Sequence, residues 1–122
     1  WKKVNHRSPI LINLINEFLK QNKIVGAICD GSTFLANNGY FDNVKHTGNG
    51  LEYIKHTCSS YKGESLYVEK ESVFDLPFIS ANGSGGIEFG KDIADALSIS
   101  DQATRDACFK RIKSGFYHIE VK

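Results

Sequence analysis

Apolar residues recur with a helical period near the start of the chain. In "SPILINLINEFLKQNK", residues 8–23, they fall three and four positions apart and so share one face of a helix: Leu11, Leu14, Ile15, Phe18 and Leu19. Ser8 suits the N-cap position, and Pro9 suits the first helical position, where no amide donor is needed. The pattern predicts an amphipathic helix that ends in the polar residues 21–23.

The period changes directly after this helix. "IVGAIC", residues 24–29, is apolar on both faces, which is typical of a parallel strand that helices cover on each side. "GSTFLANNG", residues 31–39, predicts a short helix that Gly39 stops in the left-handed cap position. The chain is therefore expected to pass from a buried strand into a helix through a tight turn at Cys29 and Asp30.

The second half of the chain predicts further strands and helices. "ESLYVE" alternates and is rich in β-forming residues, and "PFISANGSGG" reads as a strand that enters a glycine-rich loop. This order of elements predicts an α/β fold with a mainly parallel sheet. The expected elements are a short strand in 43–47, a turn of helix in 50–57, strands in 64–69 and 77–86, and helices in 87–97 and 101–115.

Composition narrows the class of protein. The 122 residues suit a single domain, and a hydrophobic fraction of 41% can supply a core. A net charge of +1 produces no long-range field for nucleic acid or an anionic membrane, and no apolar run is long enough to span a bilayer. We therefore expect neither a nucleic acid nor a membrane as a partner.

The number and spacing of the cysteines indicate the redox environment of the protein. They are odd in number and form no C-x-x-C pair, which argues against a disulfide framework or a zinc site. We therefore expect a reduced, cytoplasmic protein with no metal or cofactor. Cys29 stands at the predicted turn, whereas Cys58 and Cys108 are expected to be packing or surface residues.

The turn at Cys29 has the pattern of a nucleophile elbow, in which a strand turns sharply into a helix and exposes a reactive side chain. Backbone amides and the helix dipole at the start of a helix stabilise a thiolate, the form of cysteine that attacks carbonyl carbon. Gly26 and Gly31 would allow close packing around the strand. The alternative is that Cys29 is a small apolar core residue, and spacing alone leaves both interpretations open.

Two stretches carry a family resemblance. "VGAICDGSTFLANNGYFDN", residues 25–43, and "SANGSGGIEFGKDIADAL", residues 80–97, together resemble the ThiJ/PfpI superfamily, in particular its branch named intracellular protease/amidase. The superfamily is related to the class I glutamine amidotransferases. The resemblance implies a doubly wound, flavodoxin-like α/β fold with helices on both faces of a mainly parallel sheet.

Members of that family begin with two βα units and a strand that leads to a Pro-Gly-Gly turn. These units carry a glutamate that hydrogen-bonds the cysteine, and they amount to about sixty residues. The resemblance therefore implies that residues 1–122 are the C-terminal portion of one such domain, without its N-terminal βα units. It also implies that the missing segment is a partner, and that the protein forms a homodimer.

The resemblance implies a cysteine-dependent hydrolase or amidase that acts on a small carbonyl or amide substrate. Cys29 would attack the substrate, and the amides of Asp30 and Gly31 would hold the oxyanion. Two other functions stay open at this point. One is a glyoxalase or deglycase type of lyase on α-oxoaldehydes, and the other is a redox-sensing or chaperone-like protein in which Cys29 oxidises reversibly.

The residue expected to act as general base differs from the family pattern. Asp30 stands where the PfpI-type proteases carry a histidine, and an aspartate beside the thiol disfavours the thiolate unless it turns away. His46 in "VKHTGN" is then the expected base. Thr47 and Asn49 are expected either to line the pocket or to cap a strand. The other histidines are expected at the surface or in helix packing: His6, His56 and His118.

Overall fold

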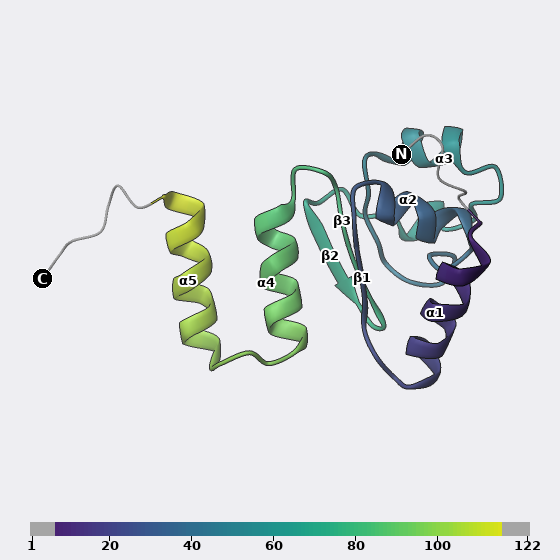
Figure 1. The fold of residues 1–122 in the computed structure, drawn as a ribbon. Helices are drawn as coiled ribbons and strands as arrows, with labels where there is room; N and C mark the ends of the chain where they lie inside the picture. Colours follow the sequence, from purple (N-terminus) through teal and green to yellow (C-terminus); the bar gives the residue numbers. More distant parts are fainter. Residues whose placement is uncertain (1–6, 116–122) are drawn as a thin grey trace, which may run out of the picture.

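The computed structural model describes residues 7–115, which form a three-stranded sheet between helices (Figure 1). The strands are β1 (Val25–Ile28), β2 (Ser72–Asp75) and β3 (Phe78–Ala81). Their order is β1-β3-β2, in which β1 pairs in parallel with β3 and β2 pairs antiparallel with β3. The helices are α1 (Pro9–Lys20), α2 (Asp30–Asn37), α3 (Leu51–Thr57), the 3-10 helix η1 (Glu64–Leu66), α4 (Gly86–Ala96) and α5 (Gln102–Ser114).

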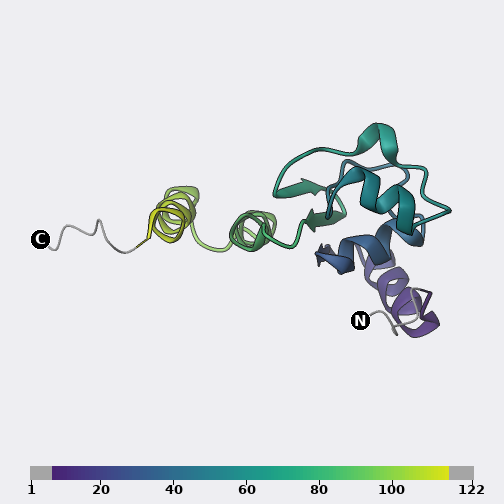
Figure 2. The same ribbon diagram turned by 90° about the horizontal axis from the view of Figure 1, so that it is seen from above.

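The helices form layers on the two faces of the sheet. α1 and α2 lie on one side, α4 lies on the other, and α5 packs against α4 farther from the strands (Figures 1 and 2). This arrangement confirms the predicted α/β class. It also brings α2 directly after β1 and α4 directly after β3, so that the two strand-to-helix connections lie at the same end of the sheet.

The helix ends follow the local chemistry of the sequence. α1 has Pro9 at its first position, as predicted. After α2, Gly39 adopts a φ of 78°, the left-handed conformation expected of it. α5 begins after Asp101, whose side chain accepts a hydrogen bond from the Thr104 amide at 2.9 Å.

The prediction of a strand over 64–69 is wrong. Residues 64–66 form η1, and the Leu66 and Tyr67 amides bond to carbonyls three residues back rather than to a neighbouring strand. Burial does not alternate along this stretch, because residues 66–68 are half-buried in succession. The strand that pairs antiparallel with β3 is β2, a run too short to stand out in the sequence. The strand expected in 43–47 is reduced to an isolated bridge between His46 and Tyr67.

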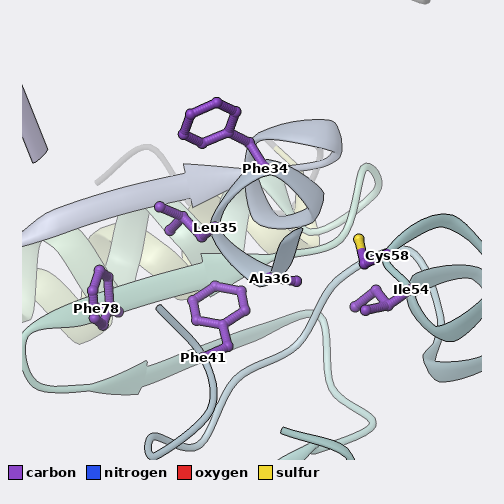
Figure 3. Packing of buried hydrophobic residues seen from close by; sticks show 7 residues of the cluster. All are labelled: Phe34, Leu35, Ala36, Phe41, Ile54, Cys58 and Phe78. Atoms are coloured by element: carbon purple, nitrogen blue, oxygen red, sulfur yellow. The ribbon is translucent and has the colours of Figure 1, made fainter. Parts of the chain in front are cut away.

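The hydrophobic core lies between α2, β3 and the loops around α3. All four residues of β3 are buried, and the middle of α2 is buried as well. Figure 3 shows the cluster, whose side chains come from α2, β3, α3 and the loops around them. Its buried members are Phe34, Leu35, Ala36, Phe41, Ile54, Cys58 and Phe78, so that Cys58 is the packing residue it was expected to be.

β1 is an edge strand of the described sheet. On one face of it, Phe89 of α4 packs so closely over Gly26 that an added Cβ would lie 3.1 Å from the ring. On the other side, the apolar face of α1 is only partly covered, and Ile10 and Leu14 are 79% and 52% exposed. The amphipathic helix is thus present as predicted, with much of its apolar face open within residues 7–115. In that range, no helix has the length and hydropathy needed to cross a bilayer.

Candidate functional site

Cys29 lies at the turn between β1 and α2, and its backbone is strained. Its φ of 57° and ψ of −127° are unusual for a residue with a Cβ, and such angles persist only where the surroundings enforce them. The Cys29 amide donates to the Ala81 carbonyl at 3.0 Å and so extends the β1–β3 ladder into the turn. The turn directs the Cys29 side chain outward, where it is exposed.

Ser32 holds the start of α2 onto both strands beneath the turn. Its fully buried hydroxyl lies 3.1 Å from the carbonyl oxygen of Ala27 in β1 and 3.1 Å from that of Ala81 in β3. One side chain therefore connects the helix that follows the thiol to the two parallel strands that precede it. This connection anchors the strained turn to both strands.

Asn49 is the side chain that reaches the thiol. Its Nδ2 donates to Cys29 Sγ at 3.4 Å, and its Oδ1 accepts from the Gly83 amide at 2.9 Å. The bond to Gly83 fixes which end of the Asn49 amide faces the sulfur, because only the NH₂ group remains to point at it. Gly83 itself packs against the thiol, and an added Cβ would lie 3.2 Å from Sγ.

Asp30 makes its contacts on the α3 side of the turn. Its Oδ1 accepts from the Tyr53 hydroxyl at 3.1 Å and lies 3.5 Å from Thr33 Oγ1. Burial, followed by the hydrogen bond to Asp30, raises the pKa of Tyr53 above its ordinary value. The carboxylate next to the thiol is therefore engaged by hydroxyl donors. Gly31 continues the first turn of α2, where backbone amides are free of intrahelical partners.

A cavity of about 550 Å³ lies beside the thiol. Asn49 and Gly83, which contact Cys29, also line this cavity. Its other lining residues come from the segments before α3, after η1 and before α4: Gly48, Gly50, Tyr67, Glu69, Lys70, Glu71, Asn82 and Ser84. The lining is mostly polar and carries both acidic and basic side chains, and it meets Cys29 through Asn49 and Gly83.

His46 is held in the core. It has no exposed surface, its Nδ1 lies 2.8 Å from the Val44 carbonyl oxygen, and its Nε2 lies 2.6 Å from the Tyr61 hydroxyl. Its ring stacks on Phe41 at a centroid distance of 4.5 Å, and burial lowers its pKa. Both ring nitrogens are thus occupied by Val44 and Tyr61, and neither contacts Cys29.

Thr47 is also a structural residue, because its amide donates to Ser80 Oγ at 2.9 Å and its hydroxyl to the Lys70 carbonyl at 2.8 Å. Of the segment that sequence reasoning singled out, only Asn49 reaches the thiol. Tyr53 and Gly83 were missed, because their contacts depend on how α3 and the loop after β3 fold around the turn. His56 is exposed, as expected, whereas His6 and His118 lie outside the described residues.

Comparison with known proteins identifies one family and two similar curated proteins. The model of the DJ-1/PfpI family matches residues 1–96. The chain is similar to the "Uncharacterized protease YoaZ" of Bacillus subtilis (strain 168), with 32% identity over 114 residues, 93% of this chain and 53% of the relative. It is also similar to the "Uncharacterized protease YdeA" of the same organism, with 31% identity over 118 residues, 97% of this chain and 58% of the relative. The chain spans somewhat more than half the length of these curated relatives.

Two solved structures resemble the fold. One is the thiJ/pfpI family protein from Bacillus anthracis, with a TM-score of 0.84 and 32% identity over 91% of this chain and 54% of the other. The second is the DJ-1 superfamily protein Atu0886 from Agrobacterium tumefaciens, with a TM-score of 0.77 and 26% identity over 85% of this chain and 55% of the other. These neighbours support the flavodoxin-like arrangement expected from the sequence.

Proposed function

Since the chain belongs to the DJ-1/PfpI family, we propose that it is a cysteine-dependent hydrolase of small amide or related carbonyl substrates, with Cys29 as its nucleophile. The observation that carries the proposal is the strained strand–helix turn, where φ of Cys29 is 57° and the sulfur is exposed. Strain at a non-glycine residue is characteristic of functional turns such as the nucleophile elbow. The names of the two Bacillus relatives, which call them proteases, agree with amide chemistry.

The chemistry follows from the groups around the sulfur. The Cys29 thiolate attacks the substrate carbonyl carbon, a carbon–sulfur bond forms, and the carbonyl electron pair moves to oxygen. Amides of Asp30 and Gly31, at the positive end of α2, stabilise that oxyanion. The carbon–nitrogen bond then breaks, and the nitrogen leaves as an amine after taking a proton from solvent. Water hydrolyses the remaining thioester, which releases the carboxylic acid and regenerates the thiol.

Asn49 supports the first step. A neutral amide N–H that points at sulfur stabilises the thiolate more than the thiol, because a hydrogen bond to the charged form favours that form. The bond from the Gly83 amide holds the donor in place before substrate arrives. The same two residues line the cavity of about 550 Å³, which is large enough for a small-molecule substrate or the end of a peptide.

We also propose that residues 1–122 are part of a larger ThiJ/PfpI-like domain. The relatives are nearly twice as long as the matched region, and β1 leaves its outer edge unpaired among the described residues. A strand that pairs with β1 would complete the sheet and cover the open face of α1, because exposed strand edges are normally paired or covered in stable proteins.

The proposal is tested by assays of the wild-type protein, the Cys29→Ser variant and the Cys108→Ser variant. Ammonia release from primary amides and cleavage of short peptides are measured, together with lactate formation from methylglyoxal. Cys108 is the matched control, because it is exposed on α5 and outside the cavity beside Cys29. We expect amide hydrolysis that Cys29→Ser abolishes and Cys108→Ser retains.

Amide hydrolysis that persists in the Cys29→Ser variant would refute the proposal that Cys29 is the nucleophile. Lactate formation without amide hydrolysis, lost in the same variant, would replace the hydrolase with a lyase at the same thiol. Loss of both activities, with a peroxide-dependent gain of mass on Cys29, would favour the redox-sensing alternative.

A further inference from the structure

One short segment contacts both residues of the elbow. Asn49 donates to Cys29 Sγ at 3.4 Å, and Tyr53, four residues later, donates to Asp30 Oδ1 at 3.1 Å. The segment consists of the residues that enter α3 and the first turn of that helix. It therefore supplies one donor to the thiol and a different donor to the carboxylate beside it.

We propose that Tyr53 is a positioning residue that holds the Asp30 carboxylate off the Cys29 sulfur and so permits the thiol to ionise. The inference rests on the proposed function, because it concerns the state of the same nucleophile. It accounts for an acidic residue at a position where a negative charge would otherwise oppose the thiolate.

The contacts of Asp30 carry the argument. Two oxygen donors approach the same carboxylate oxygen, and the Tyr53 bond is the shorter of the two at 3.1 Å, against 3.5 Å for Thr33. A hydroxyl donor withdraws part of the charge of a carboxylate and fixes its rotamer. Without Tyr53, Asp30 would retain only the long contact to Thr33 among residues 7–115, and its carboxylate would be free to rotate toward the sulfur.

Tyr53 is suited to this role over the whole range in which a thiol titrates. Its pKa is raised, first by burial and then by Asp30, with a smaller contribution from Cys29, so the hydroxyl keeps its proton. The charged side chains elsewhere on α3 are occupied with one another and with η1. Lys55 pairs with Glu52 at 3.4 Å and with Glu64 at 2.7 Å.

The test is a double-mutant cycle on the full chain. The pH dependence of Cys29 alkylation by iodoacetamide is followed by peptide mass spectrometry in the wild type, Tyr53→Phe, Asp30→Asn and the double variant. We expect Tyr53→Phe to raise the pH midpoint of alkylation by about one unit, a tenfold loss of thiolate below the midpoint. In the Asp30→Asn background, the same change should have little effect, because no carboxylate remains to be held.

The control is Tyr40→Phe, which removes a hydroxyl that bonds Asn16 at 2.9 Å on a different side of α2 and should leave the midpoint unchanged. The phenylalanine variant at Tyr53 keeps the ring, and circular dichroism confirms that each variant is folded. Equal midpoints in wild type and Tyr53→Phe would overturn the inference. A shift of the same size with and without Asp30 would overturn it as well, because Tyr53 would then act on the thiol by another route.

Failure of the proposed function has a different signature. If the coupling between Tyr53 and Asp30 is observed while the wild type hydrolyses no amide, the positioning role stands and the hydrolase falls. If amide hydrolysis is observed and lost in Cys29→Ser while the cycle shows no coupling, the hydrolase stands and the role of Tyr53 falls.

Discussion

Replacement of Ser32 by alanine removes the side chain that joins α2 to both parallel strands beneath the thiol. The Ser32 hydroxyl is fully buried and lies 3.1 Å from each of two carbonyl oxygens, those of Ala27 and Ala81. The hydroxyl has a single proton, which these two acceptors share, and a buried hydrogen bond of this kind contributes about 0.5–1.5 kcal/mol. The Ala81 oxygen keeps the Cys29 amide as a donor at 3.0 Å, so that acceptor stays paired in the variant and the expected loss is about 0.5–1.5 kcal/mol.

Urea denaturation followed by circular dichroism measures this loss as a lower unfolding midpoint at an unchanged slope. For a chain of this size, the loss corresponds to a melting temperature lower by roughly 2–8 °C. Ser60→Ala is the matched control, since its exposed hydroxyl makes one bond of 3.1 Å to the Asn37 carbonyl and should cost less than about 0.5 kcal/mol. A Ser32→Ala variant as stable as this control would refute the claim that the hydroxyl holds the turn.

Two further predictions concern the thiol and the core histidine. Gly83→Ala should slow alkylation of Cys29 severalfold, because the added Cβ would lie 3.2 Å from the sulfur. Mass spectrometry measures the alkylation rate, and an unchanged rate would contradict the packing of the loop against the thiol. His46 should make the fold less stable as pH falls below about 6.5, because its pKa is lowered by burial and the unfolded chain then binds more protons than the native one. Urea midpoints at pH 7.5 and 5.5 measure this loss, which His46→Gln should reduce and the exposed His56→Gln should leave in place.

The turn at Cys29 could be predicted from sequence because its determinants are local. An apolar run that ends at a cysteine, followed by a helical period and a glycine stop, specifies a strand, a turn and a helix within residues 24–39. β2 could not be predicted in the same way. Its four residues are ordered by pairing with β3, and the more strongly patterned stretch at 64–69 folds into η1 and its flanking turns.

Which of the candidate residues in 46–49 meets the thiol was beyond sequence reasoning for a related physical reason. His46, Thr47 and Asn49 are close in sequence, yet the first two point into the core and only Asn49 meets the sulfur. Which side chain in an irregular segment faces inward depends on contacts with Tyr61, Ser80 and the loop at Gly83, which are distant in sequence. The sequence of this irregular segment has no hydrophobic period that would indicate which side chains face inward.

The backbone conformation of Cys29 affects which amino acids are favoured at this position. A φ of 57° with a ψ of −127° is ordinary for glycine and costs a residue with a Cβ about 1–3 kcal/mol. Glycine is thus the residue that would relax the turn, and the thiol is present against the conformational preference of its own main chain. Laboratory evolution for heat resistance alone would be expected to drift toward glycine here, whereas evolution under a requirement for turnover would retain the cysteine. Under the proposed function, the residue that best suits the backbone at position 29 and the residue that does the chemistry there are therefore different.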